Sequence, residues 1–417
     1  MHQNPKGTPE AAHLSKVRWP RMTPIMVTPQ SRPPIEPYRM FFPLGVGYAA
    51  LGAGLWLVAL PGWVPYPAAL HRMLMIQGFE LCFVVGFLLT ALPGLTHSRP
   101  TTRAESGTAF AALALFGPFA LVGLDGAAHV CALLALLGVV AAMARRLPRA
   151  SQKPPAEFVH VGLGMLFGIT GSVLLIAQSF GAQAFGPPRF ADHLLSIGML
   201  LTLVLGVGSL LVPTFIGMRG PLEIPGIAKA HEWLPKFIFH ASIAALFVGA
   251  FALEAMDAPL WGARLRAAAA TIVLAMAWKL HRGPGRGDRS AWSMWGAGAF
   301  MLIGLWLAAL GSHWTLAGLH IVFIGGFGLL TFAIATRVVI AHGKHGFPSE
   351  HLLLKASVVT LLLAALAARV IGELRPERAL HWYALSGAVW TLACIVWFSA
   401  AWPRIRHNAV PAKPASN

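Results

Sequence analysis

Histidines set within apolar sequence are the residues that could do chemistry in this chain. The run from His320 to His342 is long enough to cross a bilayer and carries a histidine at each end, with Arg337 inside. At about 1.5 Å of rise per helical residue the two imidazoles would lie roughly 33 Å apart, on opposite sides of a hydrocarbon core of about 30 Å. They therefore cannot share one metal ion, and the depth of each histidine in the membrane is the main evidence about its role.

Composition defines the class of protein. Of the 417 residues 56% are hydrophobic and only 11% are charged, whereas about a quarter of the residues of a soluble domain are charged. The chain is therefore predicted to be all-α, a polytopic integral membrane helical bundle. Apolar windows of about 17 to 25 residues predict about twelve transmembrane helices, at 41–60, 73–92, 107–124, 127–144, 158–177, 193–216, 236–253, 263–280, 291–310, 314–341, 352–371 and 379–402.

The formal charge of +17 does not indicate a nucleic-acid partner, because the basic residues sort by loop. Most fall on the side of the predicted membrane that also holds both termini. The far side keeps six arginines, at positions 72, 189, 264, 266, 375 and 378. By the positive-inside rule both termini are predicted to be cytoplasmic, so the lipid bilayer is the expected partner of this charge pattern and nucleic acid is not.

The domain organisation follows from the same patterns. Residues 1–40 are basic, Pro-rich and without an apolar signal core, so we expect a disordered cytoplasmic tail. Residues 41–402 form the predicted twelve-span transmembrane domain, and 403–417 a cytoplasmic C-terminal tail. The cysteines, Cys82, Cys131 and Cys394, fall within spans and make no CxxC or CxxCH motif, which argues against disulfides and against covalently attached haem.

Three predicted helices share a feature that single residues do not reveal. The second, sixth and tenth run in the same direction, and each carries a histidine near its outer end: His71, His193 and His320. The last two share a local pattern, HLLSIG and HIVFIG. A spacing of four helices would correspond to three pseudo-symmetric four-helix units, with the three imidazoles around a common centre near the outer face.

Neutral imidazoles that converge in a dry bundle are good ligands for haem iron or copper. Met73 could add a soft thioether ligand. For any one histidine the simpler interpretation is an interfacial side chain without a ligand. Glu80 lies near mid-span, where a carboxyl group serves either a proton path or a structural pair. Arg337 could reach the inner interface or clasp a haem propionate or a helix carbonyl.

Two segments resemble a known family. The run from His71 to Pro93, HRMLMIQGFELCFVVGFLLTALP, is similar to the opening signature of the NnrS family. The run from His320 to Gly346, HIVFIGGFGLLTFAIATRVVIAHGKHG, resembles the family's most distinctive motif, including the Thr336–Arg337 pair and His342. Weaker matches are Pro37, Tyr38, Arg39, Phe41, Phe42, Pro213, Phe215 and His240.

The resemblance implies a twelve-span protein of the bacterial inner membrane that binds haem and copper and acts in the response to nitric oxide and nitrosative stress. Non-covalent haem b is the expected cofactor, with copper as a second metal and nitric oxide as a ligand. The residues and the resemblance together give the cofactor-binding candidates His71, His193, His240, His320, Arg337 and His342. The metal-ligand candidates are His71, Met73, His193 and His320.

The sequence also departs from the family pattern. Where the family has a second histidine and then a glutamate, this chain has Met73 and Leu74, and Leu210 stands where an arginine is expected. A member that binds haem without copper is therefore an open alternative. Ligand binding and catalysis are both compatible with these residues.

Two other functions compete. Haem-copper oxidases and nitric oxide reductases also have about twelve helices in three arcs of four, but they carry an HxH pair on the tenth helix. Here His313 and His320 are seven apart and no adjacent pair exists. A proton-coupled secondary transporter would use Glu80 and the histidines as a proton path, yet the chain shows no convincing inverted repeat.

Overall fold

The computed structural model describes residues 36–149, 153–218, 230–285, 287–311, 314–345 and 350–407. Most of the predicted tails, 1–40 and 403–417, lies outside these ranges, as does His313. Where the ranges meet the tails, the first helix begins at Tyr38 and the last ends at Arg406.

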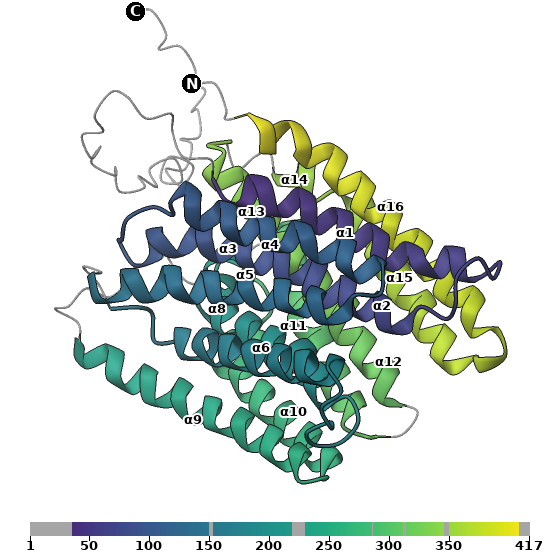
Figure 1. The fold of residues 1–417 in the computed structure, drawn as a ribbon. Helices are drawn as coiled ribbons and strands as arrows, with labels where there is room; N and C mark the ends of the chain where they lie inside the picture. The colour runs from purple at the N-terminus through teal and green to yellow at the C-terminus, as the bar shows by residue number, and fades with distance from the viewer. Residues whose placement is uncertain are drawn as a thin grey trace, which may run out of the picture. The chain divides into compact units, whose positions relative to one another are not determined.

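Within the described ranges every regular element is a helix, which confirms the predicted fold class (Figure 1). Eleven helices there are long and apolar enough to cross a membrane. The membrane-crossing helices outside the three histidine-bearing ones are α1 (Tyr38–Ala59), α4 (Arg103–Leu121), α5 (Asp125–Arg146), α6 (Phe158–Ser179), α9 (Ala230–Ala255), α11 (Arg289–Ala308), α15 (Ala356–Leu374) and α16 (Ala379–Arg406).

The remaining prediction, a span at 263–280, corresponds to α10 (Pro259–Met276). This helix is not among the eleven, because Arg264 and Arg266 lower the apolar content of its first two turns. It packs against α9, and the Arg266 guanidinium pairs with the Glu254 carboxylate near the end of α9. The two charges thus compensate each other inside the bundle.

The histidine-bearing helices form the interior of the bundle. Each is one continuous span built from short pieces: α2, η2 and α3 (Ala68–Met73, Leu74–Glu80, Leu81–Leu95), α7, η4 and α8 (Phe190–His193, Leu194–Met199, Leu200–Phe215), and α12, η7 and α13 (Trp314–His320, Ile321–Gly328, Leu329–His342). In their most apolar windows 83%, 94% and 61% of residues are buried, against 56% or less in every other span. We call these three spans the inner helices.

Each inner helix contains a π-helical segment that begins within three residues of its histidine. The middle pieces η2, η4 and η7 are π-helices, and they begin three residues after His71 and immediately after His193 and His320. π-helical turns are rare and occur mostly at functional sites. Their recurrence at equivalent places agrees with three related four-helix units.

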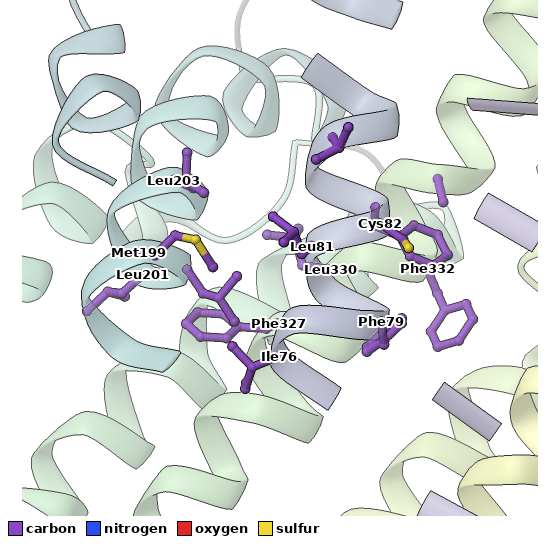
Figure 2. Packing of buried hydrophobic residues seen from close by; sticks show 14 of the residues in the cluster. Ile76, Phe79, Leu81, Cys82, Met199, Leu201, Leu203, Phe327, Leu330 and Phe332 are labelled. Carbon is purple, nitrogen blue, oxygen red and sulfur yellow. The ribbon is translucent and has the colours of Figure 1, made fainter. Parts of the chain in front are cut away.

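Apolar side chains pack where the inner helices approach one another (Figure 2). Phe79 and Phe332 lie with ring centroids 6.2 Å apart, joining the first inner helix to the third. Small residues allow the surrounding helices to come close. At Gly387 in α16 an added Cβ would overlap the backbone carbonyl oxygen of Ala53 in α1, so these two helices are in direct backbone contact.

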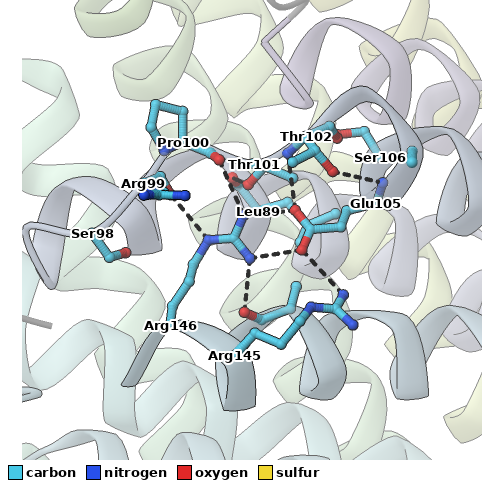
Figure 3. Close-up of polar contacts among 12 residues, drawn as sticks. Leu89, Ser98, Arg99, Pro100, Thr101, Thr102, Glu105, Ser106, Arg145 and Arg146 are labelled. Atoms are coloured by element: carbon cyan, nitrogen blue, oxygen red, sulfur yellow. Dashed lines mark hydrogen bonds and ion pairs between the residues drawn. The ribbon is translucent and has the colours of Figure 1, made fainter. Parts of the chain in front are cut away.

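A polar cluster fixes the loop before α4 to the end of α5 (Figure 3). Thr102 and Glu105 form a capping box at the start of α4. The Arg146 guanidinium donates to both carboxylate oxygens of Glu105, at 2.9 and 2.6 Å, and to the carbonyls of Arg99 and Pro100. Arg145 also reaches Glu105, at 3.1 Å, but its side chain is 59% exposed, whereas that of Arg146 is 9% exposed.

We predict that Arg146→Ala destabilises the folded protein by about 3 kcal/mol, because it leaves Glu105 without its buried cation. Arg145→Ala should cost less than about 1 kcal/mol, since an exposed ion pair contributes little. Thermal unfolding of the two variants in the same detergent compares them directly. Equal losses for both would contradict this account of the cluster.

Candidate functional site: a cavity lined by three histidines

The structure brings His71, His193 and His320 into the wall of one cavity of about 250 Å³. All three side chains stand at the start of a π-helical segment, so each inner helix contributes one imidazole. Aromatic rings supply much of the remaining wall: Trp56, Tyr66, Phe79, Phe323, Tyr383 and Trp390. A largely apolar cavity with a few converging polar groups is the usual form of a ligand site.

Hydrogen bonds orient all three imidazoles in the same way. The Nδ1 of His71 lies 2.8 Å from the Gly52 carbonyl oxygen, and the Nδ1 of His320 lies 2.8 Å from the Leu316 carbonyl oxygen. A carbonyl oxygen can only accept, so each Nδ1 carries the hydrogen. The lone pair of the neutral ring is therefore on Nε2, as it is in metal-ligating histidines whose other nitrogen is held by an acceptor.

His193 obtains the same orientation from a carboxylate. Its Nδ1 lies 2.5 Å from Oε1 of Glu254, a side chain only 1% exposed. The other oxygen, Oε2, accepts from Nη1 of Arg266 at 2.5 Å. An Arg–Glu–His chain thus leads from α10 through α9 to the second inner helix, and Glu254 and Arg266 are positioning residues that sequence reasoning missed. The sequence did contain a signal for this pair, because Glu254 and Arg266 are opposite charges within two consecutive apolar helices.

Three arginines line the same cavity: Arg72, Arg189 and Arg369. The Nε of Arg72 pairs with Asp192 at 2.8 Å, which links the first and second inner helices beside their histidines. Arg369 pairs with Glu373 at 2.7 Å and lies 3.5 Å from the centroid of the Tyr383 ring. The wall therefore holds more positive than negative charge.

Two donors in the cavity wall have no acceptor among the described residues. They are Nε of Arg369 and Nε1 of Trp390, both fully shielded from solvent. Buried N–H groups are nearly always hydrogen-bonded, so these two point to a ligand that supplies oxygen acceptors. Carboxylate groups would satisfy both the donors and the positive charge.

Glu80 is the acidic side chain that η2 adds to the wall. It is 7% exposed, and Thr331 on the third inner helix donates a hydrogen bond to its Oε2 at 3.1 Å. Within the described part of the chain no arginine, lysine or histidine lies within ion-pair distance of it. The carboxyl group therefore reaches the cavity without a compensating cation.

The other predicted residues lie elsewhere. Met73 is buried outside the cavity wall, and Met75 lines it instead. The reason is geometric, because side chains two positions apart on a helix do not share a face, whereas those four apart do. Met75 is four residues after His71.

Arg337 and His342 lie near the opposite end of the third inner helix and do not line the cavity. The Nε of Arg337 is 2.6 Å from Oε1 of Glu350, and its guanidinium lies over the Phe215 ring. The Nδ1 of His342 is 3.4 Å from Oε2 of Glu36. Both side chains are thus engaged in contacts that join helix ends.

His240 does not line this cavity and packs instead against a second histidine. The ring centroids of His160 in α6 and His240 in α9 are 5.2 Å apart, with the rings nearly perpendicular. His160 is completely buried, and neither of its ring nitrogens has a hydrogen-bond partner in the described ranges. Such a group costs free energy unless a ligand satisfies it.

Taken over the described residues, no three His, Cys, Asp or Glu side chains are close enough together to hold a metal ion by themselves. A structural zinc ion would need such a group. Haem iron needs only one or two axial ligands from the protein. Three separated imidazoles around one cavity are compatible with the ligand requirement of haem iron. They do not form the ligand group that a structural zinc ion needs.

Fold and site together define a multi-pass helical membrane protein with an imidazole-lined cavity between three inner helices. The family model described as NnrS protein matches residues 35–408, and the chain belongs to the NnrS family. No match was found among curated proteins.

We predict that Glu254→Ala destabilises the protein by about 3–5 kcal/mol, because it leaves the buried Arg266 guanidinium without a partner. The double variant Glu254→Ala with Arg266→Leu should recover much of that loss, since no unpaired charge remains. Thermal unfolding of the single and double variants in detergent measures the difference. A double variant no more stable than the single one would show that the pair does not carry this energy.

Proposed function

We propose that this protein binds haem b non-covalently in the histidine-lined cavity and acts in the response to nitric oxide in the bacterial inner membrane, with both termini in the cytoplasm. The observation that carries the proposal is the common orientation of three imidazoles, each with Nδ1 held by an acceptor and Nε2 left for a ligand in one cavity. Family membership supports the physiological role, and the distribution of basic residues supports the orientation.

The residues of the cavity fit haem. One or two of the Nε2 atoms would bind the haem iron. The aromatic wall, including Trp56, Phe79 and Phe323, would contact the faces and edges of the porphyrin. Arg369 and Trp390 offer the unsatisfied N–H donors that propionate carboxylates would accept from.

When bound, ferrous haem would supply a binding site for nitric oxide. The protein's own residues explain what it would contribute. His71, His193 and His320 would hold or face the metal through Nε2, while the apolar rings of the wall would exclude water. The arginines neutralise carboxylates that would otherwise be costly to bury. Glu254 keeps His193 in the ligating tautomer.

Copper, the second metal that the family implies, would fit the His160–His240 pair better than the histidine-lined cavity. The two rings contact each other, and His160 also contacts the Phe247 ring. Both nitrogens of His160 lack partners among the described residues. Imidazole is a good copper ligand, and a monovalent ion carries less charge into an apolar site than a divalent one. We therefore propose that His160 and His240 would hold Cu(I) if copper is bound.

The haem proposal is tested on detergent-purified protein from haem-replete cells. We expect a Soret band and a positive pyridine-haemochrome assay for the natural chain. His71→Ala and His320→Ala should lose or shift the band, because each removes an Nε2 from the cavity, whereas the exposed His351→Ala should not. A colourless natural protein would reject haem binding. An unchanged spectrum in both cavity variants would reject this cavity as the site.

The copper proposal predicts that His160→Leu abolishes bound copper and leaves the haem spectrum unchanged, because His160 does not line the histidine-lined cavity. Metal analysis of protein from copper-replete cells measures the copper content, and His351→Ala again provides the control. Copper that persists in His160→Leu, or natural protein without copper, would contradict the assignment.

A further inference from the structure

A second cavity of about 80 Å³ lies between the inner helices. Each inner helix lines it with one stripe at helical spacing. The stripes are positions 80, 83, 84, 87 and 88 of the first, 200, 203, 204 and 207 of the second, and 330, 331, 334 and 335 of the third, and Phe42 of α1 completes the wall. Steps of three and four residues keep side chains on one helix face. We call this cavity the central chamber.

The chamber follows the histidine-lined cavity along all three inner helices. In each helix the cavity residues come first in sequence and the chamber residues one or two turns later. The three helices therefore run in the same direction, and the two spaces are stacked along them. Glu80 belongs to both walls and marks the place where they meet.

The chamber is chemically unlike the cavity above it. Its lining is aliphatic and aromatic apart from Glu80 and Thr331, and those two are hydrogen-bonded to each other. A buried water needs about two to four polar partners, and apolar cavities that lack them stay dry and take up apolar molecules such as xenon. The volume far exceeds the roughly 10–15 Å³ that one water-sized probe requires.

We propose that the central chamber binds small neutral apolar molecules, of the size of diatomic gases, and passes them beside Glu80 into the histidine-lined cavity. Binding follows from the size and the lining of the chamber alone. Delivery to the histidines rests on the proposed function, in which a diatomic ligand is bound there. The Glu80–Thr331 hydrogen bond is the only polar contact at the junction that the described residues make.

Xenon is the probe for binding. Crystals of the full-length protein pressurised with xenon should show the gas in the central chamber. Val207→Phe should remove it, because the larger ring fills the space between the inner helices, and Ala335→Leu provides a second, smaller filling should the first variant fold poorly. Val173→Phe is the matched control, since Val173 is 48% exposed on α6, outside both cavities.

Xenon that is absent from the chamber of the natural protein, or a chamber occupied by ordered water or a lipid chain, would overturn the proposal. Delivery has its own readout in haem-loaded protein, the rebinding rate of carbon monoxide after photolysis. Val207→Phe should slow it several-fold and Val173→Phe should not. An unchanged rate together with lost xenon would reject delivery alone. Xenon binding needs no haem, so a protein without haem would contradict the proposed function and leave the chamber intact.

Discussion

A polar group inside an apolar bundle must be hydrogen-bonded or ligated, and this constraint organises the molecule. The Nδ1 atoms of His71 and His320 donate hydrogen bonds to backbone carbonyl oxygens, and Nδ1 of His193 is hydrogen-bonded to the Glu254 carboxylate. Each ring then has one nitrogen satisfied and one left over. Because all three residues line one cavity, a ligand that fills this cavity would be able to reach the remaining nitrogens.

The inner helices place the three imidazoles in one cavity wall, and the outer helices surround the inner ones. A π-helical turn after each histidine changes the phase of the helix within one span, so the imidazole and the apolar chamber stripe can both face inward. The surrounding helices bury the inner spans and supply the charged partners, such as Arg369 and Glu254, from outside the inner set. Positioning is thus distributed over helices remote in sequence.

Much of the fold could be predicted from the sequence, because length and apolarity are local properties. They predict the helical class and nearly all the spans. The positions of His71, His193 and His320 at the same end of three spans predicted that they share one centre, and all three line one cavity. The partners of those residues could not be predicted, because each lies at least 19 positions away or, for Leu316, depends on the rotamer. The π-helical turns could not be predicted for a similar reason, because a uniformly apolar sequence does not distinguish an α-helical turn from a π-helical one. Placing Met73 beside His71 ignored that side chains two apart diverge.

The most direct test of the account is a high-resolution cryo-EM map of the protein purified from haem-replete cells. We predict porphyrin density in the cavity between the inner helices, with iron bound by Nε2 of at least one of His71, His193 and His320 and the propionates near Arg369. Haem bound elsewhere, for example beside His342, or ligation through Nδ1 in the cavity, would contradict it.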